Sequence, residues 1–197
     1  ADQMTLSPLA PSSFPNMPKI VGINLATAAS GTRYQGRDDL MLMTFAPNCS
    51  VAGVFTKSDT AAAPVLWSRT IAKNGKAAAI ITNAGNANAF TGKLGQKAVH
   101  DIVTSLAVTL KCDANKIMFA STGVIGEPLD ATALTPYLGK LVENQTASWQ
   151  SAANAILTTD TFAKGAYATC FIEGKKITLC GIAKGSGMIA PNMATML

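Results

Sequence analysis

The chain has 197 residues, of which 48% are hydrophobic and 14% charged, and its net charge is +5. This composition is typical of a compact globular protein with a sizeable core, and it excludes a disordered chain. The sixteen lysines and arginines are scattered singly, without interleaved aromatic residues, so we expect no nucleic-acid partner. No apolar run approaches the roughly 20 residues of a membrane span, so we expect no membrane partner. The mild positive charge is compatible with small acidic substrates, although solubility explains it equally well.

The first half of the chain begins with an irregular, proline-containing arm over residues 1–19. The elements predicted after it are strands over 21–27, 40–45 and 51–56, a helix over 61–71, a strand over 77–82, and an amphipathic helix over about 93–111. The only histidine, His100, falls within this last helix, and we interpret it as solvent-exposed. Without a second histidine or clustered carboxylates, we expect no metal, and we also expect no cofactor.

The second half continues with a further set of strands and helices. They are a strand over 116–120, helices over 132–140 and 147–157, and a hairpin of strands over 167–172 and 176–182 around Glu173-Gly174-Lys175. Strands and helices alternate without a regular βαβ rhythm. We therefore predict a single α/β domain over 1–197, with helices layered on mixed or antiparallel sheets.

The four cysteines, Cys49, Cys112, Cys170 and Cys180, lie far apart and form no Cys-x-x-Cys pair. We interpret them as buried, reduced thiols of a cytoplasmic protein.

The stretch from Asn83 to Gly92 is rich in asparagine and small residues. Asparagine tolerates left-handed backbone and bonds to nearby main chain, so the stretch is compatible with an elaborate turn. Such a loop also exposes many donors, so it is equally compatible with the wall of an active site.

Thr122 and Gly123 follow the predicted strand over 116–120. A hydroxyl followed by a glycine could present an O–H and a backbone N–H to a single oxygen, as an oxyanion hole requires. On local grounds alone, a plain turn from strand to loop is the simpler interpretation.

The last stretch, Lys184 to Leu197, halts an extended run with glycines and a proline and contains Ala194 followed by Thr195. It could be a glycine-rich ligand loop or a self-cleavage junction. Cleavage before Thr195 would give that residue a free α-amino group beside its hydroxyl. The reference pKa of such an amine, about 7.7–8, suits a general base.

Four segments together carry a resemblance to a known family: 82–89, 121–126, 158–161 and 184–197. In this order the chain resembles the ornithine acetyltransferases, the bifunctional glutamate N-acetyltransferases of bacterial arginine biosynthesis, over essentially its whole length. The resemblance implies a helix–sheet–sheet–helix sandwich of mixed and antiparallel strands, an architecture shared with the self-processing aminopeptidase DmpA.

The resemblance also implies cleavage between Ala194 and Thr195, so that residues 1–194 form the α chain and 195–197 begin the β chain. Thr195 is then the nucleophile. The Thr122 hydroxyl and the Gly123 backbone N–H form the oxyanion hole, and Thr158 and Lys184, with Thr195, bind substrate.

In this family the acetyl group passes from N-acetylornithine to the nucleophile and then to glutamate by a ping-pong mechanism, and some members also accept acetyl-CoA. The implied partner is the β chain of the same precursor, in an α2β2 or larger assembly. One alternative is an aminopeptidase or amidohydrolase with an N-terminal nucleophile. A second is a dinucleotide-binding module, based on Gly185-x-Gly187-x-x-Ala190, although Pro191 would fall within the required helix.

Overall fold

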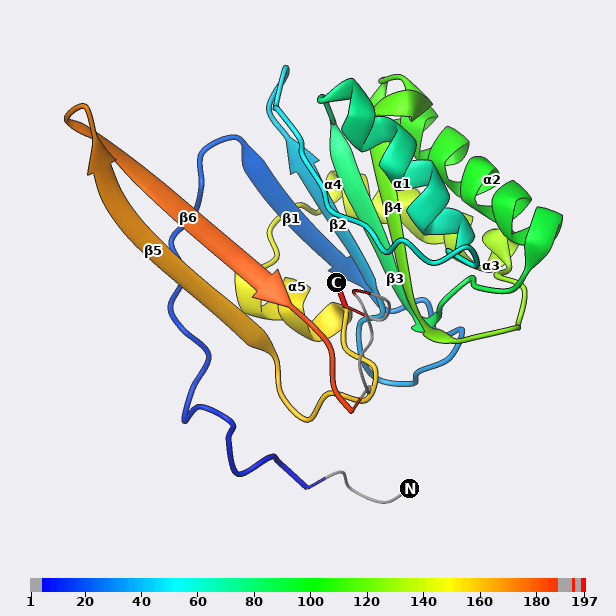
Figure 1. Ribbon diagram of the computed structural model, residues 1–197, viewed down its shortest axis with the longest axis horizontal. Helices are drawn as coiled ribbons and strands as arrows, with labels where there is room; N and C mark the ends of the chain where they lie inside the picture. Colours follow the sequence, from blue (N-terminus) through cyan, green and yellow to red (C-terminus); the bar gives the residue numbers. More distant parts are fainter. Residues whose placement is uncertain (1–4, 188–192, 194–195) are drawn as a thin grey trace.

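A four-stranded sheet forms the centre of the structure (Figure 1). Its strands, in spatial order, are β1 (Ile23–Ala28), β2 (Leu40–Phe45), β3 (Ala79–Asn86) and β4 (Ile117–Val124). The pairs β1–β2 and β2–β3 are antiparallel, whereas β3 and β4 are parallel. This computed structural model describes residues 5–187, 193 and 196–197.

The described residues also form several helices and a second sheet. The helices are α1 (Ala63–Asn74), α2 (Gly92–Leu110), α3 (Ala131–Leu134), α4 (Leu138–Glu143) and α5 (Trp149–Ala155), with short 3-10 turns at Ala114–Lys116 and Thr135–Tyr137. The second sheet is an antiparallel hairpin of β5 (Lys164–Ile172) and β6 (Lys175–Ala183).

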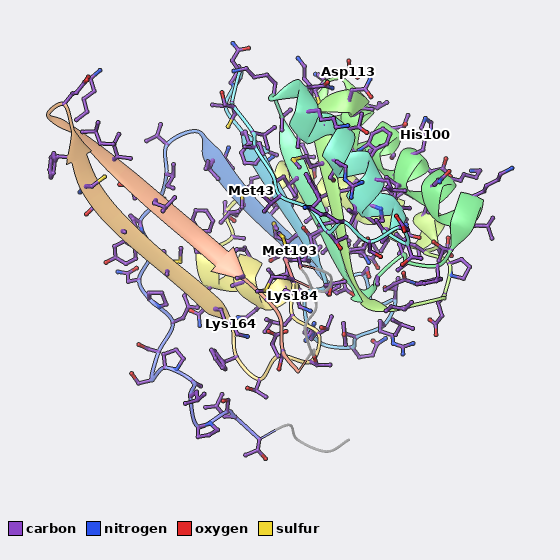
Figure 2. The ribbon with its side chains drawn as sticks, viewed as in Figure 1. Met43, His100, Asp113, Lys164, Lys184 and Met193 are labelled. Atoms are coloured by element: carbon purple, nitrogen blue, oxygen red, sulfur yellow. The ribbon has the colours of Figure 1, made fainter. Side chains whose placement is uncertain are left out.

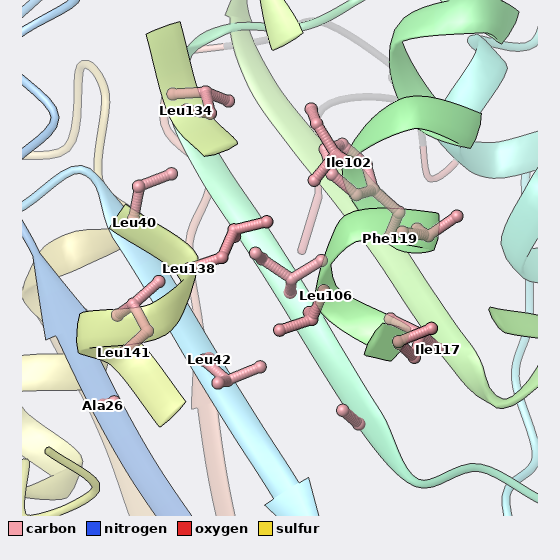
Figure 3. Close-up of a cluster of buried hydrophobic side chains, with 14 of the residues drawn as sticks. Ala26, Leu40, Leu42, Ile102, Leu106, Ile117, Phe119, Leu134, Leu138 and Leu141 are labelled. Carbon is pink, nitrogen blue, oxygen red and sulfur yellow. The ribbon is translucent and has the colours of Figure 1, made fainter. Parts of the chain in front are cut away.

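The largest hydrophobic core lies between one face of the central sheet and the helices α2, α3 and α4 (Figure 3). Leu40 and Leu42 on β2 meet Leu138 and Leu141 on α4, and Ile102 on α2 packs into the same cluster. All five side chains are essentially inaccessible to solvent. The apolar face of α2, whose residues recur every four positions, therefore packs against this core, as the periodicity predicts.

The opposite face of β1 and β2 is covered by α5 and the base of the hairpin. Leu25 and Met41 pack with Trp149 of α5, and Cys180 and Ile182 of β6 lie against the same cluster. Together the mixed sheet, the antiparallel hairpin and the flanking helices confirm the predicted α/β class with layered helices.

The hairpin has a tight turn and an apolar outer surface. Glu173 and Gly174 both have positive φ, 50° and 75°, which is the backbone of a two-residue hairpin turn. Beyond its base the hairpin projects from the rest of the fold (Figure 1). Ile172, Ile177 and Leu179 lie on one face of it and are exposed, Leu179 to 71%.

Helix α1 covers the outer edge of β4 by hydrogen bonds from its side chains. Ser68 Oγ accepts a bond from the Phe119 backbone N–H (2.8 Å) and donates to the Phe119 carbonyl oxygen (2.7 Å). Trp67 Nε1 donates to the carbonyl oxygen of Ile117 (2.8 Å). An open strand edge is a site for unwanted pairing, and here a helix occupies it.

Three predicted elements need correction. Residues 51–56 form no strand, because β2 is already paired on both edges, with β1 and β3. The strand predicted over 116–120 continues to Val124, so Thr122 and Gly123 lie within β4 and not in a loop. The helix predicted over 132–140 is divided by a 3-10 turn at Pro136, since proline cannot donate the main-chain bond of a continuous α-helix.

The prediction that the cysteines are buried is also wrong. Cys170 is exposed, and Cys49, Cys112 and Cys180 are half-buried; all four are free thiols. His100 does lie on the outer surface of α2, as predicted (Figure 2). Within the residues that the structure describes, no helix has both the length and the apolar character to cross a membrane.

The Ser68 contact predicts a measurable effect on stability. The change S68A leaves a buried N–H and a buried carbonyl of Phe119 without this partner, which should lower the free energy of unfolding by about 1–3 kcal/mol. The matched control is T70A on the same helix, whose exposed hydroxyl bonds only to Leu66 and should change stability by less than about 0.5 kcal/mol. Urea unfolding measures both; equal losses would contradict the edge-covering role of Ser68.

Candidate active site

The ammonium group of Lys184 is the centre of a buried polar cluster. Lys184 follows β6 directly and is 1% exposed. Its Nζ donates to Thr158 Oγ1 (2.7 Å) and to Thr122 Oγ1 (3.0 Å). Three residues distant in sequence, each expected from the sequence to belong to the site, therefore meet at one amine.

The carboxylate of Asp160 completes the cluster. Asp160 Oδ1 accepts hydrogen bonds from Lys164 Nζ (2.5 Å) and from the Gly185 backbone N–H (2.8 Å). Its other oxygen lies 3.8 Å from Lys184 Nζ. Lys164 and Lys184 both lie at the base of the hairpin (Figure 2). Two ammonium groups and one carboxylate leave one excess positive charge in this part of the site.

Burial and the neighbouring charges shift the pKa values of these groups. Burial lowers the pKa of Lys184, the Asp160 carboxylate opposes this shift, and the Lys164 ammonium adds to it. Burial raises the pKa of Asp160, but the bonds from Lys164 and Gly185 and the charges of Lys164 and Lys184 outweigh it and leave that pKa below its ordinary value. Asp160 is therefore ionised at neutral pH.

The backbone around Thr122 is shaped by an unusually close approach of β3 and β4. Gly123 has φ of 135°, and a Cβ at this position would lie 2.3 Å from the carbonyl carbon of Gly85 and 2.6 Å from the nitrogen of Asn86. The strand register shifts at the same place, between Gly85 and Asn86. Only glycine fits at position 123, since any side chain would push the two strands apart.

The asparagine-rich stretch supports this arrangement through its amides. Asn83 Oδ1 accepts from Ser121 Oγ (2.5 Å), and Asn83 Nδ2 donates to the Asn86 carbonyl (2.9 Å). Asn88 Nδ2 bonds to the Gly95 carbonyl (3.0 Å). Residues 83–86 of this stretch belong to β3, and Asn83 bonds across to Ser121 of β4, so only the part after Asn86 forms a turn, in which Asn88 bonds to the first turn of α2. Through its bond to Ser121, Asn83 also contacts the residue that precedes Thr122.

Arg37 fixes the chain next to Thr158. Its guanidinium donates to the carbonyl oxygen of Leu157, and its Cζ lies 3.9 Å from the centre of the Tyr34 ring. The loop that carries Arg37 thus contacts the chain just after α5, where the loop with Thr158 and Asp160 begins. No motif in the sequence pointed to a role for Arg37.

The described end of the chain pairs with Lys184. The Lys184 N–H donates to the Leu197 carbonyl oxygen (2.9 Å), and the Leu197 N–H donates to the Lys184 carbonyl oxygen (3.4 Å). The expected junction, Ala194 and Thr195, lies outside the described residues, as do Ala190 and Pro191. The structure therefore brings Thr122, Gly123, Thr158 and Lys184 together and does not describe the expected nucleophile.

Two residues of this cluster were not expected from the sequence as site residues. Asp160 lies in the hydroxyl-rich segment 158–161, in which the resemblance to the family assigned a role only to Thr158. Lys164 begins the following strand, β5. A carboxylate within a threonine-rich loop was the available signal for Asp160. No pattern in the sequence linked Lys164 to Lys184, because the contact depends on how the hairpin closes.

Other features of the surface lie apart from this cluster. Two open hollows, of about 350 and 630 Å³, lie along α1 and α2 and share Ala63, Leu66 and Gln96 in their walls. Neither includes a residue of the cluster. Among the described residues, no group of three or more histidines, cysteines, aspartates or glutamates could hold a metal ion.

The fold and the cluster define a layered α/β protein with a buried polar site at the carboxyl ends of two parallel strands. The ArgJ family model matches residues 24–197. The chain belongs to the ArgJ family.

Similar proteins agree with this assignment. The arginine biosynthesis bifunctional proteins ArgJ of Bradyrhizobium diazoefficiens and Agrobacterium fabrum are 50% and 49% identical to the chain, each over 98% of it. The chain spans about half the length of these relatives, 47% of each.

Solved structures agree as well. The crystal structure of ArgJ from Bacillus halodurans matches with a TM-score of 0.79 and 34% identity, covering 90% of this chain and 92% of that chain. The crystal structure of ornithine acetyltransferase complexed with ornithine, from Mycobacterium tuberculosis, matches with a TM-score of 0.79 and 33% identity, covering 87% and 92%.

The contact between β3 and β4 predicts that Gly123 cannot be replaced. The change G123A combines a strained φ with a clash against the backbone of Gly85 and should cost about 3 kcal/mol or more of unfolding free energy. G126A is the matched control, because Gly126 also has positive φ (89°) but no atom within 4 Å of its added Cβ. It should cost only about 1–2 kcal/mol, the strain alone. Denaturant unfolding that gave equal losses would contradict the close approach.

Proposed function

We propose that residues 1–194 of this chain form the α segment of a self-cleaving acetyltransferase that moves an acetyl group from N-acetylornithine to glutamate. The observation that carries the proposal is the buried Lys184 ammonium, which joins the hydroxyls of Thr122 and Thr158. Membership of the ArgJ family and the likeness to an ornithine acetyltransferase support the same reaction. On this proposal residues 195–197 begin the second segment.

Self-cleavage requires the hydroxyl of Thr195 to attack the carbonyl carbon of Ala194, forming an ester that water then opens. The products are a carboxylate on Ala194 and a free amine on Thr195. The pairing of Leu197 with Lys184 supports this step, because it anchors the chain two residues beyond the expected junction beside the cluster. The new amine has a pKa suited to accepting the proton of the hydroxyl.

Acetyl transfer then proceeds in two half-reactions. The Thr195 oxygen attacks the acetyl carbonyl of N-acetylornithine while the amine takes the hydroxyl proton. The C–N bond breaks, that proton passes to the leaving amine of ornithine, and an acetyl ester remains on Thr195. The amino group of glutamate attacks the ester carbonyl and loses a proton to the base. The ester C–O bond then breaks, the proton returns to the Thr195 oxygen, and N-acetylglutamate leaves.

Each tetrahedral intermediate places a negative charge on the former carbonyl oxygen. The Thr122 hydroxyl and the Gly123 N–H are the proposed donors to this oxygen. Because Thr122 Oγ1 already accepts a bond from the Lys184 ammonium, its own hydrogen is free to point elsewhere and becomes a stronger donor. The ammonium thus supports the oxyanion hole from behind.

The substrates proposed for the site are acidic or zwitterionic amino acids. The excess positive charge of Lys164, Asp160 and Lys184 suits a substrate carboxylate, and Thr158 offers a hydroxyl beside it. Acetyl-CoA as a second donor is an extension of the same chemistry at Thr195. We propose no cofactor and a cytoplasmic location, in keeping with amino-acid biosynthesis.

The proposed partner is a β chain from the same precursor, in an α2β2 or larger assembly. The relatives are about twice as long as this chain, and the exposed apolar side chains on the outer face of the hairpin provide a surface for the remainder to cover.

Mass spectrometry of the full-length precursor tests the proposal. Wild type should yield two fragments, the second beginning at Thr195, whereas T195A should stay intact because it lacks the attacking oxygen. T195S, which keeps a hydroxyl, is the matched control and should still be cleaved.

Cleavage of T195A at the same bond would contradict the proposal. Measuring the release of ornithine from N-acetylornithine, with and without glutamate, distinguishes the acetyltransferase from the aminopeptidase alternative. Acetyl transfer requires added glutamate for sustained release, whereas transfer to water does not.

A further inference from the structure

The carboxylate of Asp160 ties together the two ends of the β5–β6 hairpin. Lys164 begins β5 and pairs with Ala183 at the end of β6. Asp160 Oδ1 bonds to Lys164 Nζ (2.5 Å) on one side and to the Gly185 N–H (2.8 Å), just beyond β6, on the other. The Asp160 side chain is fully buried, with 0% exposed. This single carboxylate thus fixes Lys164, whose partner Ala183 precedes Lys184, and Gly185, which follows it.

The second oxygen of Asp160 faces the amine itself. Asp160 Oδ2 lies 3.8 Å from Lys184 Nζ and is buried without a hydrogen-bond partner among the described residues. A lysine ammonium has three N–H donors, and two of them are used on Thr122 and Thr158. Asp160 thus supplies a negative charge to the amine while leaving its third donor unclaimed by a hydrogen bond within the described structure.

No other carboxylate in the described structure balances Lys184. The central strands β1–β4 and helix α5 contain no ionisable side chain. The charged groups that act on Lys184 are Asp160, which raises its pKa, and Lys164, which lowers it; burial lowers the pKa most. The charge state of the amine therefore depends on Asp160.

We propose that Asp160 is a positioning residue for acetyl transfer: it keeps the Lys184 amine protonated and fixed on the hydroxyls of Thr122 and Thr158. This inference rests on the proposed function. On this proposal Asp160 does not act on the reacting atoms directly. It acts through Lys184, because a neutral amine carries no positive charge and its hydrogen bonds to the hydroxyls of Thr122 and Thr158 would lose their charge assistance and weaken.

The proposal predicts the direction of a pH effect. Acetyl transfer requires Lys184 protonated, so the alkaline limb of the kcat/KM profile follows the pKa of Lys184. D160N removes the charge that raises this pKa but keeps a side chain of the same shape, whose amide oxygen can accept from Lys164 and Gly185. An opposite charge at this distance raises the pKa of an amine by about one or more. The alkaline limb should therefore move down by about one unit, and kcat/KM above the limb should fall about 10-fold.

Two further variants separate this role from a structural one. K164M removes a like charge near Lys184, so it should move the alkaline limb to higher pH, opposite to D160N. D39N is the matched control, because Asp39 is also buried (1% exposed) but bonds to the backbone N–H and hydroxyl of Ser30 and not to a lysine. It should leave the alkaline limb in place. D160E, which restores the charge, should restore most of the wild-type profile.

The experiment uses the full-length processed enzyme, with acetyl transfer measured between pH 6 and 10 and the Lys184 side chain titrated by nitrogen-15 NMR. A lower Lys184 pKa in D160N, together with the shifted alkaline limb, supports the proposal. An unchanged Lys184 titration, or shifts of the same sign in D160N and K164M, overturns it. If wild type transfers no acetyl group to glutamate, the proposed function fails instead, and the NMR titration still decides whether Asp160 controls the amine.

Discussion

A buried ammonium group is the constraint on which this structure depends. Removing a charge from water is costly unless hydrogen bonds and an opposite charge compensate for it. Lys184 meets that requirement with the hydroxyls of Thr122 and Thr158 and with the carboxylate of Asp160. Thr122 comes from β4, Thr158 and Asp160 from the loop after α5, and Lys184 itself from the base of the hairpin. The central sheet and the second sheet must therefore dock correctly before the charge is balanced.

The rest of the fold positions these partners. α1 covers the outer edge of β4, and the hydrophobic core beneath α2 and α4 packs the central sheet against these helices. At the other end of β4, the absence of a side chain at Gly123 lets the strand approach Gly85 closely, which sets the backbone next to Thr122. Arg37 secures the chain just before Thr158. The same geometry that satisfies the buried charge thus fixes the Thr122 hydroxyl next to the constrained backbone of Gly123.

Much of this architecture follows from local patterns. The four-residue spacing of α2, the apolar run of β2 and the Glu173-Gly174 turn are short-range signals, and the elements formed where those signals predicted them. Predictions that needed long-range information failed. Residues 51–56 resemble a strand, but whether a strand forms depends on a free sheet edge, and β2 has none.

The site shows the same division. Resemblance to a family pointed to Thr122, Thr158 and Lys184, which the structure brings together. It did not point to Asp160 or Lys164, and the contacts of Asp160 with Lys184 and Gly185 form only when the end of β6 returns to the loop after α5. Local composition cannot predict a charge balance made from separate elements, because the sequence distance between partners carries no information about their separation in space.

The most direct test of the account is to locate the acetyl group. The full-length processed enzyme is incubated with N-acetylornithine alone, quenched in acid and digested, and the peptides are identified by mass spectrometry. We expect one acetyl ester, on the hydroxyl of Thr195, and its loss when glutamate is added before the quench. Acetyl on a different residue, or an ester at Thr195 that glutamate does not remove, would contradict it.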